Sequence, residues 1–237
     1  MIRSLHIGVS TIGQGVINAC ISRNRSIPAG AVDINPAMVG KPLSEVVPGV
    51  AADAVIYGSL QEALEAGPWD VAVLCTASAL SSIRRDLETL IAAGINVVST
   101  SEELAYPELQ NPVAYGELNA AAETAGVTIV GTGVNPGFVL DTLIIALSGT
   151  CADVSKITAR RVNDLSPFGP TVMASQGIGL SPEDFEKGLE SGAIAGHIGF
   201  EQSIHMIASS LGIRLEKITQ SLEPIISRTS RKTPCVS

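Results

Sequence analysis

The 237-residue chain contains few cysteines, no long apolar run and no excess of positive charge. Its four cysteines lie far apart without a Cys-x-x-Cys pair, which favours free thiols in a reducing cytoplasm. The most apolar stretch is interrupted by Asp141, so no window of about 18 apolar residues can span a membrane. The N-terminus lacks the sustained apolar core of a signal peptide. A net charge of −8 without a basic stripe would repel phosphate backbones, which argues against nucleic-acid binding.

Apolar residues make up 46% of the chain and charged residues 16%, which predicts a folded protein with a sizeable core. In the first part of the chain, short apolar runs typical of strands alternate with stretches of helical spacing. The expected strands cover 5–9, 31–34, 54–57, 71–75, 95–99 and 127–130, and the expected helices cover 12–24, 60–66, 80–93 and 113–125. This alternation favours right-handed crossovers and an α/β fold with a doubly wound parallel (Rossmann) sheet. We therefore expect a dinucleotide-binding domain over residues 1–140.

The pattern changes in the remaining residues, 141–237. Residues 155–163 alternate in polarity, which predicts a half-exposed strand, and residues 218–226 are also strand-like. Helices are expected near 182–190 and 199–211. This part of the chain is therefore expected to form a smaller α+β domain.

A glycine turn follows the first expected strand and opens the first expected helix, where a dinucleotide-binding motif belongs. In this turn, Gly8-Val-Ser-Thr-Ile-Gly13, amides at the helix N-terminus would hold a pyrophosphate. Asp33 lies 20 residues after Gly13, where an acid hydrogen-bonds a ribose hydroxyl. The candidate cofactor-binding residues are Gly8, Ser10, Thr11, Ile12, Gly13 and Asp33, with NADP or NAD as the cofactor. The alternative is a strand–helix turn that needs its glycines only for packing.

Three further loops follow the carboxyl ends of expected strands, which is where ligands bind in open α/β sheets. The loop after the fourth strand contains the short hydroxyl residues Thr76 and Ser78. The loop after the fifth contains Thr100, and the loop after the sixth contains Asn135 within a run rich in glycine and proline. These four residues are further candidates for cofactor binding.

Four motifs in this order make the sequence recognisable: Ser99-Thr-Ser-Glu-Glu-Leu104, Gly131-Thr-Gly-Val-Asn-Pro-Gly137, Gly177-Ile-Gly179 and Gly196-His-Ile-Gly199. With them the chain resembles the 2,4-diaminopentanoate dehydrogenases and the native amine dehydrogenases grouped with them. Their nucleotide domain is similar to that of dihydrodipicolinate reductase, whose own signature of paired histidines, Lys and an Asp-Ala-Pro-Ser-Gly-Thr run is absent here. The resemblance implies NAD(P)-dependent oxidative deamination of an amine, or its reverse, the reductive amination of a small ketone or aldehyde with ammonia.

The resemblance also has implications for assembly. It implies a homodimer in which the second domain, 141–237, contributes the partner surface and the substrate site. Relatives continue for roughly another hundred residues, so the second domain is expected to be shortened and to expose a sheet edge.

In this resemblance Glu102 is the catalytic acid that anchors the amine nitrogen. Chemistry independently favours a carboxylate there: hydride from the nicotinamide adds to an iminium carbon, and an anion stabilises the cationic nitrogen. The adjacent Glu103 stays open as the alternative, although it is also suited to capping a turn or facing water.

Several residues are expected around the substrate. Pro136 and Phe138 are expected to shape the cavity floor, with core packing as a nearly equal reading of Phe138. Arg160 and Arg161 face opposite ways on the expected strand, so at most one points inward. An inward arginine, taken as Arg161, favours a substrate carboxylate, as in a diamino acid; without one, a simple ketone is favoured. Phe168 is expected to close the pocket.

His197 belongs to the Gly-His motif and is the last candidate for the substrate pocket. Together with Glu201 and His205 it recurs every four residues, which raises the question of a metal site. Three such positions extend about 12 Å along a helix, too far for one ion, so no metal is expected.

One function from another class stays open. Ser10 replaces the middle glycine of the turn, and the chain ends early relative to the family it resembles. Both features favour a catalytically impaired nucleotide-binding or scaffold protein as the alternative to an enzyme.

Overall fold

The computed structural model describes residues 1–51, 53–165, 170–227 and 229. Six parallel strands form one sheet in the order β3-β2-β1-β4-β5-β6. They are β1 (Ile2–Ile7), β2 (Ser26–Val32), β3 (Ile56–Tyr57), β4 (Val71–Leu74), β5 (Asn96–Ser99) and β6 (Ile129–Gly131). The predicted Rossmann sheet is therefore confirmed.

The carboxyl ends of the strands lie level with one another. Ile7 pairs with both Val32 and Leu74. Leu74 in turn pairs with Ser99, and Ser99 pairs with Gly131. The loops that follow these five residues therefore leave the sheet along a single edge, which is where the sequence predicts the site.

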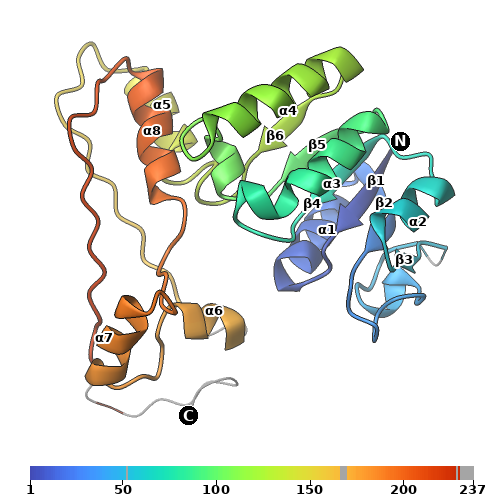
Figure 1. Cartoon of the computed structure of the whole chain (residues 1–237), viewed down its shortest axis with the longest axis horizontal. Coiled ribbons are helices and arrows are strands. Elements are labelled where there is room, and N and C mark those ends of the chain that lie inside the picture. Colours follow the sequence, from blue (N-terminus) through green and yellow to red (C-terminus); the bar gives the residue numbers. More distant parts are fainter. Residues whose placement is uncertain (52, 166–169, 228, 230–237) are drawn as a thin grey trace.

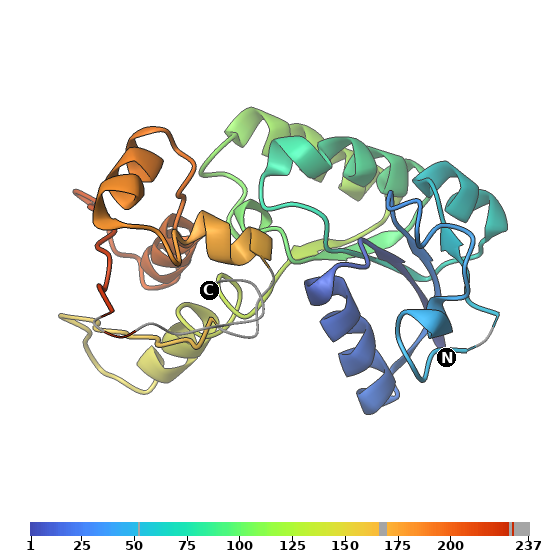
Figure 2. The ribbon, with the colours of Figure 1, turned by 90° about the horizontal axis from the view of Figure 1, so that it is seen from below.

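Helices cover both faces of the sheet (Figures 1 and 2). One face packs against α2 (Leu60–Ala66), α3 (Leu80–Ala92) and α4 (Pro112–Ala125), and the other against α1 (Thr11–Arg23) and the 3-10 helix η1 (Leu43–Glu45). The core is divided in the same way, with Leu74 and Leu87 on the first side and Ile17 and Ile56 on the second. Burial on both faces explains why β4 is apolar at every position.

Local signals set the ends of these helices. The Ser59 hydroxyl accepts a hydrogen bond from the Glu62 amide at 3.2 Å and so caps α2. Gly126 ends α4 in the left-handed conformation, with φ 68°. At 14 residues α4 is the longest helix described, and none in the described chain reaches the length of apolar helix that a bilayer crossing requires.

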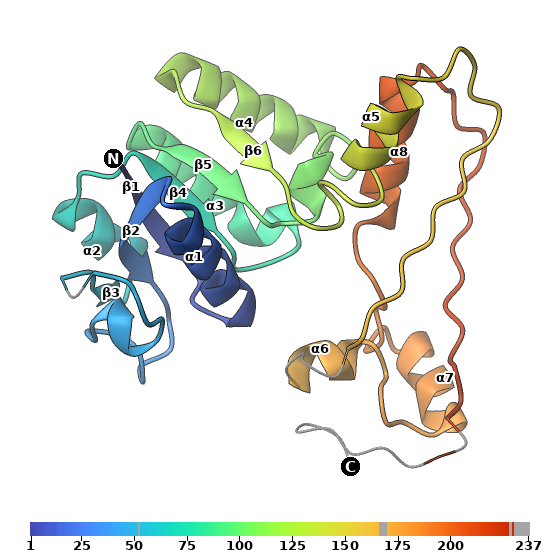
Figure 3. The same cartoon turned by 180° about the vertical axis from the view of Figure 1, so that it is seen from behind.

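Beyond residue 138 the described chain contains helices and no strand. They are α5 (Thr142–Ser148), α6 (Pro170–Ser175), α7 (Pro182–Glu190) and α8 (Phe200–Ser210), which confirms the helices predicted at 182–190 and 199–211. α5 packs against α8, and α8 contacts the 3-10 helix η2 (Glu103–Ala105) at the carboxyl edge of the sheet (Figure 3). The second region therefore approaches the sheet at the loops of the predicted site.

The strands predicted over 155–163 and 218–226 are wrong. Both segments are described throughout and lack strand pairing. A strand needs a neighbouring backbone to satisfy its amides and carbonyls, and no described segment of this region supplies that partner. The expected sheet edge of the second region is therefore not formed within the described residues.

Candidate active site at the carboxyl edge of the sheet

The glycine turn lies between β1 and α1, as predicted. The Gly8 amide donates to the Val32 carbonyl at 2.9 Å, which holds the turn against the end of β2. Ser10 is the N-cap of α1, but its side chain makes no capping hydrogen bond, and Thr11 and Ile12 are exposed. A Cβ on the buried Gly13 would collide with the Gly8 carbonyl. The turn thus presents an open helix N-terminus, a geometry suited to binding an anion.

Asp33 lies directly against this turn. Its carboxylate Oδ2 accepts a hydrogen bond from the Val9 amide at 2.8 Å, and its Oδ1 accepts one from the Asn35 amide at 2.9 Å. The structure therefore brings the predicted acid and the predicted glycine turn together at one end of the sheet.

The loops after β4 and β5 are joined by hydrogen bonds. The Ser78 carbonyl accepts from the Glu103 amide at 3.1 Å and from the Ser101 hydroxyl at 2.7 Å. The Thr100 amide donates to the Leu74 carbonyl at 3.0 Å. Burial raises the pKa of the Cys75 thiol, and a hydrogen bond with the Thr100 side chain acts against that rise. These bonds hold the loop after β5 against the loop after β4, while the Thr76 side chain stays exposed.

Glu102 and Glu103 have different surroundings. The Glu103 carboxylate accepts a hydrogen bond from the Leu80 amide at 2.7 Å and so caps α3, whose N-cap, Ala79, has no side chain able to do so. Glu102 is half-buried and lies beside Gly199, which approaches from the second region. Glu103 therefore caps a helix that begins 23 positions earlier in the chain, not the neighbouring turn that the sequence suggests, and Glu102 faces the junction of the two regions.

Asn135 and His197 come from different regions and meet at this junction. Asn135 is buried, and its Nδ2 lies 2.5 Å from the His197 Nε2. The Asn135 Oδ1 is buried without a hydrogen-bond partner among the described residues. The pKa of His197 is lowered by burial first and by the Arg161 charge second, while Glu102 acts in the opposite direction. A neutral His197 can accept the Asn135 amide proton at Nε2.

Gly199 explains how the Gly-His motif reaches the sheet. Its φ of 107° lies in the region that favours glycine, and a Cβ there would collide with the ring of Pro136. His197 also packs edge-on against Phe200, with ring centroids 4.6 Å apart. The motif is therefore pressed against the loop after β6 and places His197 next to Glu102.

The other predicted pocket residues differ in how far they are buried. Pro136 is buried in the junction, whereas the Phe138 side chain is 52% exposed, so core packing does not describe it. Arg161 is half-buried and its Nε donates to Asn163 at 2.9 Å, while Arg160 is exposed. Phe168 lies outside the described residues.

The three residues considered for a metal site do not converge. His197 faces Asn135, whereas the His205 Nδ1 donates to the Glu201 carbonyl at 2.8 Å within α8. Across the described residues, no group of three His, Cys, Asp or Glu side chains is placed to hold a metal ion.

Sequence reasoning missed the role of Asp141. This carboxylate is fully buried and accepts hydrogen bonds from the Gly137 amide at 2.7 Å and the Ser203 hydroxyl at 2.8 Å. It also accepts from the Thr142 amide as the N-cap of α5. It therefore ties the loop after β6 to α8. The sequence signal for this role is that Asp141 is the single acid in an otherwise apolar stretch. That pattern by itself indicated only that the stretch does not span a membrane.

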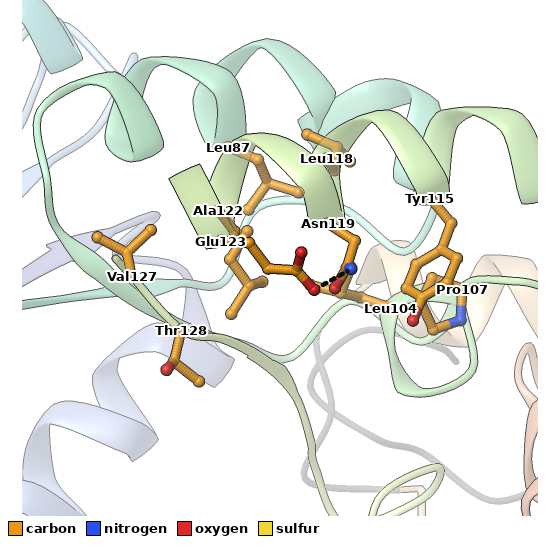
Figure 4. A pocket seen from close by; sticks show the side chains of 11 residues that line it. Leu87, Leu104, Pro107, Tyr115, Leu118, Asn119, Ala122, Glu123, Val127 and Thr128 are labelled. Atoms are coloured by element: carbon orange, nitrogen blue, oxygen red, sulfur yellow. Dashed lines mark hydrogen bonds between the residues drawn. The ribbon is translucent and has the colours of Figure 1, made fainter. Parts of the chain in front are cut away.

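A cavity of about 270 Å³ lies under α4 at the edge of the sheet (Figure 4). Its apolar wall includes Leu87, Leu118 and Ala122, and its rim carries the Asn119–Glu123 hydrogen bond of 2.9 Å. None of the predicted site residues that the structure describes lines it. The candidate active site is therefore the separate junction around Glu102, Asn135 and His197.

The strand order, the glycine turn and the acid after β2 together define a Rossmann dinucleotide-binding protein. Residues 138–237 match the family model of the 2,4-diaminopentanoate dehydrogenase C-terminal domain. The 2,4-diaminopentanoate dehydrogenase of Acetoanaerobium sticklandii is 37% identical over 236 residues, covering 98% of this chain and 67% of that protein. An amine dehydrogenase from Mycobacterium smegmatis has the same fold, with a TM-score of 0.80 at 23% identity, over 99% of this chain and 69% of that one. The chain belongs to the 2,4-diaminopentanoate dehydrogenase family.

Proposed function

We propose that this chain is an NAD(P)-dependent dehydrogenase that acts on the CH–NH2 group of a small amine and, in reverse, aminates a small ketone or aldehyde with ammonia. The proposal rests on the different surroundings of the two adjacent acids. Glu103 is engaged in capping α3, and Glu102 lies half-buried at the junction beside His197 and Gly199. The 37% identical relative, named 2,4-diaminopentanoate dehydrogenase, supports the reaction class.

The residues at the carboxyl edge fit a dinucleotide. The open N-terminus of α1 offers amides and a positive dipole end to a pyrophosphate, because Ser10 does not cap it. Asp33 is held against the same turn, in position to accept a hydrogen bond from a ribose. The Asn135 Oδ1, which has no hydrogen-bond partner in the described part of the chain, suits an N–H donor of a ligand at the other end of the edge. A bound nicotinamide supplies or accepts the hydride.

Glu102 has two tasks in this proposal. Its carboxylate holds the substrate nitrogen and stabilises the positive charge that the nitrogen carries when the C–N double bond forms. It also moves protons to and from the substrate during addition of ammonia and loss of water. Burial and the Arg161 charge lower the pKa of the His197 imidazole and so favour its neutral form, while the Glu102 charge acts in the opposite direction. Glu102 is then the anion that the substrate nitrogen meets.

The loops on both sides hold this geometry. Gly199 packs on Pro136, and Asp141 ties the loop after β6 to Ser203 of α8. These contacts hold the second region against the loop after β6, and a fixed wall there would orient the substrate relative to the edge of the sheet.

The test compares two isosteric variants of adjacent residues. Glu102→Gln is expected to lower kcat by a factor of about 10² to 10⁴ in assays that follow NADH or NADPH consumption with ammonia and a panel of small ketones. Glu103→Gln is the matched control, since its amide oxygen still accepts from the Leu80 amide, and it is expected to retain activity. Wild-type turnover in Glu102→Gln would overturn the assigned role. Dinucleotide binding without turnover of any substrate would favour the catalytically impaired alternative.

A diamino acid is the second candidate substrate, and the position of Arg161 favours it. Arg161 lies near His197, because its charge lowers the pKa of that imidazole, and its Nε donates to Asn163 at 2.9 Å. A guanidinium in this place can pair with a substrate carboxylate through its Nη groups. Arg161→Gln is expected to raise KM for 2,4-diaminopentanoate about ten- to a hundredfold and to leave KM for a small amine without a carboxylate unchanged. Arg160→Gln, at the exposed neighbour, is the control. Equal effects on both substrates would remove this candidate.

Three further parts of the proposal concern organisation. The division into a nucleotide domain, 1–140, and a substrate and dimerisation domain, 141–237, stays a prediction, as does a cytoplasmic location. A homodimer is supported by the apolar groove of about 320 Å³ that α8 forms with residues 154–157 and 213–215. Sedimentation velocity of the purified chain distinguishes the dimer from the monomer.

A further inference from the structure

Two of the glycine motifs, Gly177-Ile-Gly179 and Gly196-His-Ile-Gly199, lie against each other in the second region. Gly177 follows α6 with a φ of 68°, and a Cβ there would collide with the side chains of Phe185 and Ile194. The chain therefore turns sharply after α6. The last carbonyls of a helix have no partner inside it, and the carbonyl of Ser175 at the end of α6 is one of these.

The Gly-His motif supplies the partners of that carbonyl. The amides of Ala195 and Gly196 donate to the Ser175 carbonyl at 3.1 and 3.2 Å. The side chain of Gln176 makes a third bond, in which its Nε2 donates to the Gly196 carbonyl at 2.6 Å. Gly196 thus has the peptide plane on its amino side held by Ser175, and the plane on its carboxyl side held by Gln176.

The second of these bonds bears on the direction of the His197 side chain. Gly196 is buried with a φ of 63°, in the region that favours glycine, and a glycine does not restrict the rotation of the next peptide plane by itself. The Gly196 carbonyl and the His197 Cα belong to the same plane, so a rotation of that plane displaces the imidazole. The His197 Nε2 lies 2.5 Å from the Asn135 Nδ2. The bond from Gln176 therefore fixes the plane from which the imidazole reaches the junction.

We propose that Gln176 is a positioning residue of the active site, which holds His197 against Asn135 and keeps the imidazole in the tautomer with its proton on Nδ1. The inference rests on the proposed function, because it takes the junction around Glu102 as the active site. The Asn135 Nδ2 is a donor, so the His197 Nε2 accepts and the ring proton lies on Nδ1. Without the bond from Gln176, the peptide before His197 rotates and the contact with Asn135 is lost.

The charged groups that face His197 determine what this loss does to the site. Burial and the Arg161 charge lower the pKa of His197, and the Glu102 charge acts in the opposite direction. Glu201, the first charged residue of α8, is exposed. An imidazole that leaves the contact with Asn135 is less buried, so its pKa rises towards the ordinary value of about 6.5. Once protonated, it pairs with the carboxylate of Glu102, which the substrate nitrogen requires.

The first experiment determines the tautomer of His197 and needs no turnover. The chain contains three histidines, so long-range proton–nitrogen correlation spectra resolve their rings, and His197→Gln assigns the relevant signals. The unmodified chain is expected to carry the proton on Nδ1. Gln176→Met has a side chain of similar length that cannot donate, and it is expected to give a mixture of tautomers and a higher pKa of His197. A proton on Nε2 in the unmodified chain, or an unchanged tautomer and pKa in Gln176→Met, overturns the proposal.

The second experiment measures the effect on the reaction. Gln176→Met is expected to lower kcat/KM for the amine about ten- to a hundredfold, because the wall beside Glu102 is displaced. The acidic limb of its pH profile is expected to move to higher pH, because His197 then takes up a proton at higher pH. The Kd values of NADH and NADPH are expected to stay unchanged, since the glycine turn belongs to the other region. A lower kcat/KM with an unmoved pH profile would show that Gln176 serves only the packing of the second region, and would overturn the proposal.

Two further variants separate the bond from the shape of the side chain. Gln176→Glu keeps the shape and has no donor at neutral pH, so it is expected to change the tautomer of His197 as Gln176→Met does. A retained Nδ1 tautomer in Gln176→Glu would overturn the proposal. Gln61→Met makes the same substitution at an exposed residue of α2, whose side chain donates to Glu65, and is expected to change neither tautomer nor kinetics. An unmodified chain that turns over no amine overturns the proposed function, whereas the tautomer of His197 still tests the hold by Gln176.

Discussion

The sheet region, residues 2–131, and the second region, residues 138–227, differ in how completely they bury their apolar side chains. The sheet has a core on each face, built from strands and helices close together in the sequence. Among the described residues of the second region, the buried apolar side chains are Met173, Phe185, Ile194 and Ala208. Val162 and Ile225 remain 80% and 100% exposed there. Both regions have clear apolar periodicity, so periodicity alone does not produce a core.

The difference lies in where the partners of each segment come from. Each strand of the sheet pairs with a neighbour supplied by a crossover within residues 2–131. The segments 155–163 and 218–226 have the composition of strands but find no neighbouring strand among the described residues. Their apolar side chains therefore stay in contact with water. Stability should thus be concentrated in the sheet, and the following predictions test this from the largest expected effect to the smallest.

Truncation of one core residue should have the largest effect. Leu87 of α3 is fully buried in the sheet core, so Leu87→Ala is expected to lower the free energy of unfolding by about 3 to 5 kcal/mol. Ile225→Ala, at a fully exposed position of the second region, removes a side chain of similar size and is expected to change it by less than about 0.5 kcal/mol. Urea unfolding of the two variants decides the matter. Comparable losses would show that the second region is as well packed as the sheet.

The stability of the sheet should also depend on pH through the ionisation of His6. This side chain of β1 is buried, and burial lowers its pKa to about 4 from an unfolded value of about 6.5. The unfolded chain therefore binds a proton between these values and the folded chain does not, so stability present above pH 6.5 is lost as the pH falls towards 4. The expected loss is about 3 kcal/mol. Urea unfolding between pH 7 and 4.5 measures it.

The control for this prediction is His6→Gln, which cannot take up the proton. Its stability should fall less between pH 7 and 4.5 than that of the unmodified chain, although it starts lower because the bond to Ser4 at 3.0 Å is altered. Parallel pH curves for the two proteins would contradict the assignment to His6.

Weakening the hydrogen bonds that Asp141 makes between the two regions should have the smallest effect on the free energy of unfolding and a larger effect on activity. Asp141→Asn weakens the bonds to the Gly137 amide and the Ser203 hydroxyl, and is expected to cost about 1 to 2 kcal/mol. Because the loop after β6 then loses its tie to α8, KM for the amine should rise more than the Kd for the dinucleotide. Ser203→Ala, which removes only one of these bonds, should give a smaller change in the same direction. An unchanged KM for the amine in both variants would show that the bonds of Asp141 do not position the site.

Much of the sheet and of the nucleotide turn could be predicted from local pattern. Gly13 and Asp33 are found by their spacing, because a parallel βαβ unit places the end of each strand at one edge. Glu102 could be named, but its distinction from Glu103 depended on which carboxylate reaches the Leu80 amide. That contact joins residues 23 positions apart and leaves no periodic signal. The role of Asp141 was hidden for the same reason, since its partner Ser203 lies 62 positions further along the chain.

The sequence by itself determined the alternation of strands and helices in the Rossmann sheet and the glycine turn with its acid, because these depend on periodicities and caps that act over a few residues. Only the tertiary structure decided that His197 meets Asn135, that Glu103 caps α3 and leaves Glu102 at the junction, and that the alternating segments of the second region form no sheet. These outcomes depend on hydrogen-bond partners distant in the chain. A side chain's contacts are set by the backbone that reaches it, and a strand exists only where another strand lies beside it.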